Sequence, residues 1–113
     1  MNTYIAWLDE RVERLSALGQ EYVRQGRLDD KKLVNIRINV LGIFRSVWTA
    51  YTGAGKGVED YRAKMEEIGI CWQKHMEEAE RHGDNVAAAV EAVKLEIFGE
   101  VMHRLAQVGG MEE

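Results

Sequence analysis

The segment KKLVNIRINVLGIFRSVWTAY, which spans Lys31–Tyr51, decides how this chain must pack. Read as a helix, it carries two adjacent apolar stripes, because apolar residues recur twice at three- and four-residue steps. The first stripe consists of Leu33, Ile36, Val40, Ile43, Val47 and Tyr51, and the second of Val34, Ile38, Leu41 and Trp48. A surface helix of a small monomer normally needs one stripe. We therefore expect this helix to be covered on two sides, by its own chain and, for the surplus, by a second one.

Outward from this segment, the same periodicity predicts a single domain, residues 1–113, of four helices at 3–25, 30–52, 58–82 and 85–108. The chain contains no proline, and Gly26 and Gly83 stand where helices should end. We expect Asp29 or Asp30, and then Asp84 or Asn85, to cap the helices that follow. Because the connections are short, neighbouring helices should run antiparallel, in an all-α, up-down four-helix bundle.

The composition is typical of a folded protein, since 46% of the residues are apolar and 30% are charged. The single Cys71 indicates a reducing compartment. The N-terminal residues lack the apolar core of a signal peptide, and no apolar run has the length of a membrane span. We therefore expect a cytoplasmic protein.

Charge is distributed unevenly along the chain, whose net charge is −4. Residues 24–64 carry nine Lys and Arg against four Asp and Glu, whereas residues 65–113 carry four against eleven. These opposite charges should attract each other within the bundle or across a dimer, and either region could steer a partner.

The fourth predicted helix also has a surplus of apolar residues beside its main stripe. The predicted interface, on helices two and four, consists of Val34, Ile38, Leu41, Trp48, Leu95, Phe98 and Met102. Exposed together, these side chains would form a patch large enough to mark an interaction site, with Trp48 as its anchor. We expect a protein that acts by protein–protein association, as a homodimer or a subunit of a larger assembly, with no cofactor and no catalytic site.

An enzymatic alternative rests on acidic residues of helices three and four. Glu77-Glu78-Ala-Glu80-Arg81, followed by Glu96 and Glu100, resembles the paired acidic helices of MazG-type all-α NTP pyrophosphohydrolases, which hold Mg²⁺. The chain departs from the family motifs, since Arg81 occupies the place of the third acid and Glu100 that of an aspartate. The resemblance implies a metal site at Glu77, Glu78, Glu96 and Glu100.

Other candidate motifs are incomplete. Glu100-Val-Met-His103 is a single Glu-x-x-His without the second copy that a di-iron bundle needs. Cys71 and His75 lie one helical turn apart, but a metal would need further ligands. The glycine-rich segment 53–57 lacks the spacing of a phosphate-binding loop, so we expect a flexible helix connector.

Nucleic-acid binding is a third alternative, in which the chain would be a small helical subunit of a nucleoprotein complex. A basic patch at the first helical hairpin could contact phosphates; it consists of Arg24, Arg27, Lys31, Lys32 and Arg37. Against it, Arg37 and Arg45 are also expected to pair with acids of the fourth helix.

Each predicted helix contains an interior glycine: Gly19, Gly42, Gly69 or Gly99. A glycine in a helix interior costs about 1 kcal/mol relative to alanine. Close helix crossings would explain that cost, and we expect one at Gly42, which has apolar neighbours.

Overall fold

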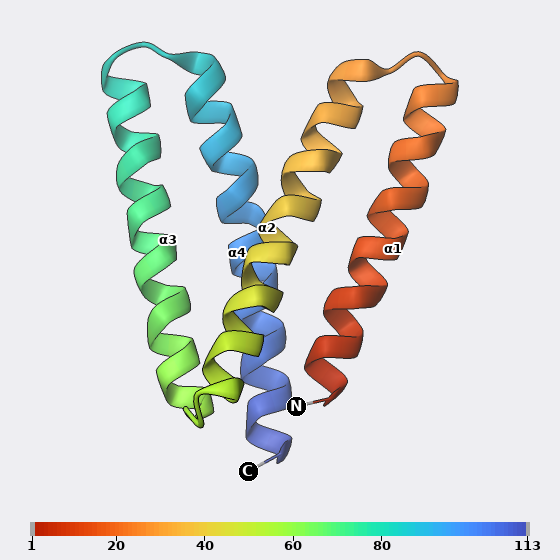
Figure 1. Cartoon of the computed structure of the whole chain (residues 1–113). Helices are drawn as coiled ribbons and strands as arrows, with labels where there is room; N and C mark the ends of the chain where they lie inside the picture. The colour runs from red at the N-terminus through yellow and green to blue at the C-terminus, as the bar shows by residue number, and fades with distance from the viewer. Residues whose placement is uncertain (1, 113) are drawn as a thin grey trace.

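The computed structural model describes the backbone of residues 2–112 and the side chains of residues 3–107. This part of the chain forms four helices, α1 (Asn2–Arg24), α2 (Leu28–Gly53), α3 (Val58–Arg81) and α4 (Asn85–Glu112) (Figure 1). No strand occurs within residues 2–112. The all-α, four-helix prediction is confirmed, and each helix begins and ends within four residues of its expected bounds.

The three turns between the helices share one hydrogen-bonding pattern. Each contains a glycine with positive φ, namely Gly26 at 72°, Gly55 at 75° and Gly83 at 69°. The residue after the glycine donates its N–H to the carbonyl five residues earlier, as in Arg27 to Tyr22 at 2.8 Å and Lys56 to Tyr51 at 2.9 Å. In both turns the cationic side chain of the donating residue also lies over the ring of the accepting tyrosine. Arg27 is 4.4 Å from the Tyr22 ring centroid, and Lys56 is 4.6 Å from the Tyr51 ring centroid. The segment expected to be a flexible connector is therefore a defined helix stop.

Helix starts are stabilised in different ways. The Asp84 carboxylate accepts the Ala87 N–H at 3.0 Å, which confirms Asp84 as the cap of α4. The prediction for α2 is wrong, because its N-cap position is Arg27 and no side chain caps the helix there. Asp29 and Asp30 lie inside the first turn, where their negative charge interacts favourably with the positive end of the helix dipole.

The four helices form two hairpins that meet at one end and separate at the other (Figure 1). We call α1 and α2 hairpin 1, and α3 and α4 hairpin 2. The central helices α2 and α4 pack on each other where the hairpins converge, while α1 and α3 lie outside. The radius of gyration is 15.4 Å, against about 13 Å for a compact domain of this length. The difference reflects the open end, at the turns 25–27 and 82–84.

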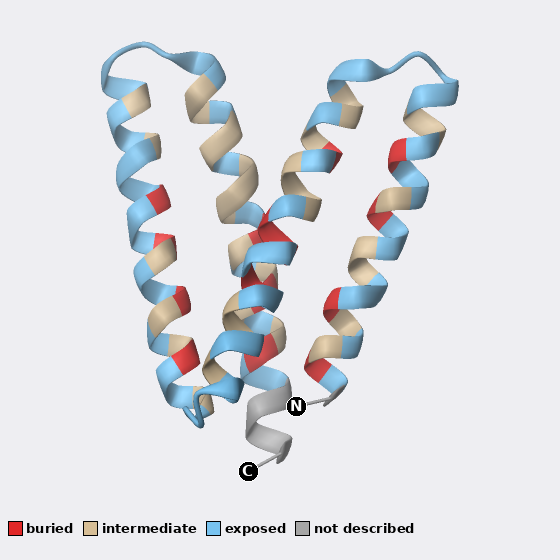
Figure 2. Ribbon diagram, in the orientation of Figure 1, coloured by how far each residue is buried: buried red, intermediate tan, exposed pale blue. Residues whose placement is uncertain are grey.

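Helix α2 is covered on two sides, as its two stripes require. It packs against α1 and against α4, and both stripes contribute buried residues, Val40 from the first and Val34 and Leu41 from the second. Buried residues are concentrated where the hairpins converge (Figure 2). Both covering helices belong to the same chain.

Two buried tyrosines link the outer helices at the convergent end. Tyr4 on α1 and Tyr61 on α3 have their hydroxyl oxygens 2.6 Å apart, and Tyr61 lies 2.9 Å from the Phe44 carbonyl. Because a carbonyl only accepts, Tyr61 donates to Phe44 and Tyr4 donates to Tyr61. Burial raises the pKa of Tyr4 to about 12, and burial together with Tyr4 raises the pKa of Tyr61.

Two interior glycines, Gly69 and Gly19, lie close to a neighbouring helix, and neither is the one expected; at Gly19 the neighbours of an added Cβ would be Lys31 and Val34 of α2. A Cβ built on Gly69 would lie 2.4 Å from Cζ of Phe98, so the Phe98 ring packs directly on the backbone of α3. Nothing approaches within 4 Å of a Cβ on Gly42 or Gly99. The predicted packing role of Gly42 is therefore wrong, because that position faces open space.

Candidate functional site

An apolar groove separates the inner faces of α2 and α4 at the open end of the molecule. We call it the inter-hairpin groove, and its volume is about 430 Å³. Its apolar lining consists of Leu33, Ile36, Val86, Ala89 and Val90, and its polar lining of Asp29, Lys32 and Asn85. Val86 has 77% of its surface exposed, which is unusual for a large aliphatic side chain. The groove therefore presents apolar side chains from two helices to solvent.

The groove arises because two core stripes continue beyond the core. On α4, Ile97, Val101 and Leu105 are fully buried, whereas Val86 at the start of the same stripe is exposed. On α2 the first stripe behaves similarly, since Val40 is buried and Leu33 is only half-buried. The stripes become exposed at the point where the hairpins diverge.

The apolar residues of the groove were not predicted as a site, because their stripes were expected to face the core. One signal was present in α4, where the small side chain of Ala89 lies beside Val86 and Val90 on the side that lines the groove. A methyl group at this position does not fill the space between two diverging helices.

The predicted interface residues are mostly covered by their own chain. Val34 and Leu41 are buried in the core. The other five are half-buried against that core: Ile38, Trp48, Leu95, Phe98 and Met102. Trp48 packs edge-on against Tyr61, with ring centroids 4.9 Å apart. Of the three large aliphatic residues that remain exposed on α2 and α4, Leu28, Ile43 and Val86, the most exposed is Val86, which lines the inter-hairpin groove.

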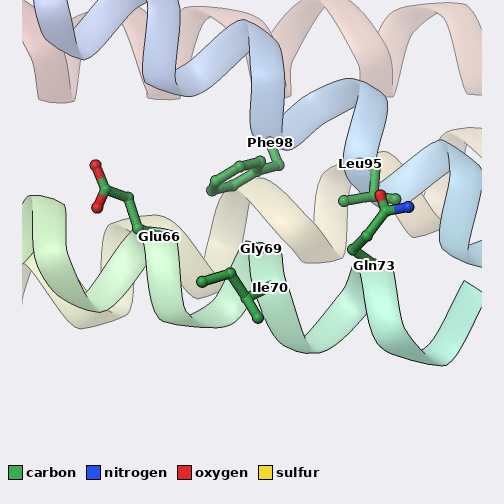
Figure 3. Close-up of a pocket in the computed structure, with 6 residues that line it drawn as sticks. All are labelled: Glu66, Gly69, Ile70, Gln73, Leu95 and Phe98. Carbon is green, nitrogen blue, oxygen red and sulfur yellow. The ribbon is translucent and has the colours of Figure 1, made fainter.

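A second hollow lies between α3 and α4, above Gly69 (Figure 3). Its volume is about 400 Å³, and its lining consists of Glu66, Gly69, Ile70, Gln73, Leu95 and Phe98. It includes two predicted interface residues, Leu95 and Phe98. The Phe98 ring lies against α3 and forms one wall, while Ile70 opposite is 58% exposed. This hollow is smaller and less apolar than the groove.

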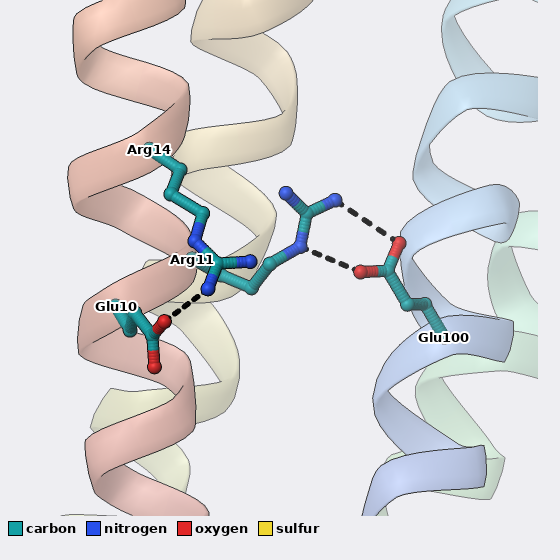
Figure 4. Close-up of polar contacts among 4 residues, drawn as sticks. All are labelled: Glu10, Arg11, Arg14 and Glu100. Atoms are coloured by element: carbon teal, nitrogen blue, oxygen red, sulfur yellow. Dashed lines mark hydrogen bonds and ion pairs between the residues drawn. The ribbon is translucent and has the colours of Figure 1, made fainter.

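The acidic residues of the enzymatic alternative do not form a metal site. Among the side chains of residues 3–107, no three His, Cys, Asp or Glu lie together in a group that could hold a metal ion. Glu100 instead accepts two hydrogen bonds from Arg11, at 2.6 Å and 3.3 Å (Figure 4). Glu96 accepts one from Arg37 at 3.4 Å. Both carboxylates therefore serve as links between the hairpins.

The remaining candidate ligands lie on the exposed side of α3. Glu77 accepts a hydrogen bond from Gln73 at 3.2 Å, and Glu78 is exposed beside it. Cys71 Sγ and His75 Nε2 are 3.7 Å apart, as their spacing predicted, but no third ligand joins them in the described region. The convergence of Glu77, Glu78, Glu96 and Glu100 that Mg²⁺ binding needs is not observed.

The basic patch is largely neutralised within hairpin 1. Arg24 pairs with Glu21 and lowers the pKa of that carboxyl, and Arg27 donates to Asp30 at 2.7 Å. Lys31 lies along α1 beside Gly19. Only Lys32 extends toward the groove. Phosphate binding would therefore have to compete with existing ion pairs.

Two arginines of α2, Arg37 and Arg45, form ion pairs with other helices, but only Arg37 pairs with the helix that was expected. Arg37 pairs with Glu96 of α4, as predicted. Arg45 pairs instead with Asp9 of α1, at 2.7 Å, so the expectation of an α4 partner is wrong for this residue. The Asp9 carboxylate raises the pKa of the Arg45 guanidinium.

We found no match to this chain among models of protein families, among curated proteins or among solved structures. None of the helices, over the described residues, combines the length and apolarity needed to cross a membrane.

Proposed function

We propose that the protein functions by associating with a second copy of itself through the inter-hairpin groove. In this proposal α2 and α4 are the associating helices of an antiparallel four-helix bundle. The second copy covers the groove between them at the open end of the molecule. The observation that supports the proposal is the exposed apolar lining of the groove, with Val86 77% exposed.

The energetic case follows from the size of the lining side chains. Burying one large aliphatic side chain contributes about 1.5–3 kcal/mol. A symmetric interface buries two copies each of Leu33, Ile36 and Val86; only Val86 contributes the full value, because Leu33 and Ile36 are already half-buried. The total is comparable to the cost of association, about 4–15 kcal/mol. Burial of the groove lining can therefore supply the free energy needed for a dimer of moderate affinity.

Charge favours a second copy as the occupant. Hairpin 1, residues 3–53, carries eight Lys and Arg against six Asp and Glu, while residues 58–107 of hairpin 2 carry six against eleven. Two copies can thus meet with basic and acidic elements facing each other, which reduces repulsion between molecules of like net charge.

The proposal is tested by the mass of the protein in solution, measured by sedimentation equilibrium. The wild type should be a dimer of a 12.9 kDa chain. Val86→Glu should be monomeric, because it places a charge in the apolar interface. Its helical content and thermal unfolding as a monomer should be unchanged, because Val86 is exposed. A wild type that is monomeric at millimolar concentration would contradict the proposal.

The matched control is Ile70→Glu, which introduces the same charge at an exposed aliphatic residue outside the groove. Ile70 is 58% exposed and lies on α3. This variant should remain dimeric. Substitutions at Leu41 or Trp48 are unsuitable, because these side chains pack in the core and their loss would affect folding.

We further propose that the protein acts in the cytoplasm. The support is Cys71, which is free and exposed, a state that a reducing compartment preserves. Fractionation of the native host's cells, followed by detection with an antibody, tests the location; recovery with secreted proteins would contradict it.

A further inference from the structure

A cysteine and a histidine lie together on the exposed side of α3, away from the inter-hairpin groove. Cys71 and His75 are one helical turn apart, and both side chains are exposed. Cys71 Sγ and His75 Nε2 lie 3.7 Å apart, in the geometry of a hydrogen bond that involves sulfur. The two atoms therefore face the same small gap, which is open to solvent.

The separation of these two atoms matches that of two ligands on one zinc ion. Zinc binds thiolate sulfur at about 2.3 Å and imidazole nitrogen at about 2.0–2.1 Å. With these bond lengths, a separation of 3.7 Å gives an S–Zn–N angle of about 117°, close to the tetrahedral value of about 109°. Cys71 and His75 can therefore chelate Zn²⁺ with almost no rearrangement.

One chain supplies only half of a tetrahedral ligand set. Structural zinc sites have four protein ligands. Among the side chains of residues 3–107, no third His, Cys, Asp or Glu joins this pair in a group that could hold a metal ion. Helix α3 lies on the outside of the molecule, so the missing ligands can come from another molecule (Figure 1).

We propose that Cys71 and His75 bind Zn²⁺ together with the same two residues of a second copy, in one shared Cys₂His₂ site. A twofold axis through the ion relates the two pairs, so each protomer contributes identical ligands. The inference does not rest on the proposed function, because neither residue lines the groove.

Charges around the pair allow two copies to approach each other. Glu67, Lys74 and Glu78 lie within one turn on the same side of α3, and Lys64 pairs with Glu67 at 3.8 Å. Two acids and two bases balance locally, although the whole chain has a net charge of −4. Binding releases the proton of each Cys71 thiol, and the two thiolates balance the charge of the ion.

Zinc titration of the Val86→Glu variant tests the site, because this variant removes the groove contact. In a non-thiol reducing agent, Zn²⁺ should convert the monomer into a dimer by sedimentation, with saturation at one ion for two chains. A chelator should reverse the change. Binding should weaken as pH falls, because protons compete with the metal for the thiolate and the imidazole. Co²⁺ in place of Zn²⁺ should give a thiolate-to-metal charge-transfer band.

Substitutions of the ligands should abolish the metal-dependent dimer. Cys71→Ser and His75→Ala each remove two of the four ligands of the shared site. Each should therefore weaken zinc binding by more than the roughly 10–100-fold that follows loss of an outer-shell partner. Both residues are exposed, so helical content and thermal unfolding should be unchanged. The matched control is His103→Ala, since the His103 ring contacts Gln107 and has no cysteine beside it; it should bind zinc as the parent does.

Three outcomes would overturn the inference. Absence of zinc binding at millimolar metal excludes the site, and one ion bound per chain without dimerisation excludes the shared ligand set. A dimer that forms without metal and disappears on reduction is a Cys71 disulfide, not a zinc site. None of these results bears on the groove, because the proposed function fails only if the metal-free wild type is monomeric.

Discussion

Arg11 on α1 holds Glu100 on α4 through two hydrogen bonds, from Nε to Oε1 at 2.6 Å and from a terminal nitrogen to Oε2 at 3.3 Å. The Arg11 side chain is 25% exposed to solvent and the Glu100 side chain is 36% exposed. The pair links the two hairpins near the end where they converge. The neighbouring pair of Arg14 and Glu10 lies entirely on α1 and is more exposed (Figure 4).

We therefore expect the Arg11–Glu100 pair to contribute to stability and the Arg14–Glu10 pair to contribute little. A double-mutant cycle with Arg11→Met and Glu100→Gln should give a coupling energy of about 1 kcal/mol, since the pair is bidentate and partly shielded. The measurement is urea unfolding at fixed protein concentration, at low and at high salt. The coupling should decrease with salt, because both groups remain partly exposed.

The same cycle with Arg14→Met and Glu10→Gln is the control. Pairs within one exposed helical turn usually contribute less than about 0.5 kcal/mol. Equal coupling energies for the two pairs would show that Arg11 and Glu100 do not link the hairpins as the geometry indicates.

Gly69→Ala should destabilise the protein, because the added methyl group would lie 2.4 Å from the Phe98 ring. Overpacking of this kind costs about 1–3 kcal/mol, although the intrinsic helix propensity of alanine is better than that of glycine. Chemical denaturation measures the loss. Combining Gly69→Ala with Phe98→Leu should recover part of it, because a smaller side chain leaves room for the methyl group.

The control for this prediction is Gly42→Ala, at a helix interior position where nothing lies within 4 Å of the new Cβ. This variant should be stabilised by about 0.5–1 kcal/mol through helix propensity alone. If both alanine variants are stabilised, the contact between Phe98 and Gly69 is looser than the structure shows.

Periodicity and turn glycines were sufficient to predict four helices and their approximate bounds, because both act locally along the chain. The two stripes of α2 also predicted that this helix is covered on two sides, but the second stripe was expected to meet another chain, whereas Val34 and Leu41 are buried within the same chain. Which helix covers each stripe is a tertiary property. Val34 and Leu41 were assigned to a partner surface but lie in the core, whereas Leu33 was assigned to the core but lines the groove.

The misassignment has a physical cause. Adjacent stripes on one helix differ by about 100° of rotation, and their apolar content is similar, so composition does not show which stripe faces the core. The angle at which the hairpins diverge decides it. That angle depends on contacts between distant residues, such as Phe98 against Gly69, which no single helix pattern contains.

Val34→Ala and Leu33→Ala test which stripe of α2 forms the core. Val34 is fully buried, so its truncation should cost about 2 kcal/mol even though it removes only two methyl groups. Leu33→Ala removes more atoms but should cost less, because Leu33 is already partly exposed. Both should be measured by urea unfolding in the Val86→Glu background, so that dimer dissociation does not contribute. A larger loss for Leu33→Ala would reverse the assignment.

The buried pair of Tyr4 and Tyr61 predicts a loss of stability at alkaline pH. In the unfolded chain a tyrosine ionises near pH 10, whereas burial raises the pKa of Tyr4 to about 12 in the folded protein. Between these values the unfolded state binds fewer protons than the folded state, so the free energy of unfolding falls as pH rises. The contribution of each buried tyrosine is about 1.4 kcal/mol per pH unit in that window. Below pH 10 the pair contributes no pH dependence.

Tyr4→Phe isolates this effect from the titration of lysines. At pH 8 it should destabilise the protein by about 1 kcal/mol, because the hydrogen bond that Tyr4 donates to Tyr61 is lost. Between pH 10 and 12 its free energy of unfolding should fall less steeply than that of the wild type, since one buried titrating group has been removed. Urea unfolding at a series of pH values compares the two slopes directly. Identical slopes would mean that Tyr4 ionises as freely in the folded protein as in the unfolded chain, which its position between Trp48 and Tyr61 does not allow.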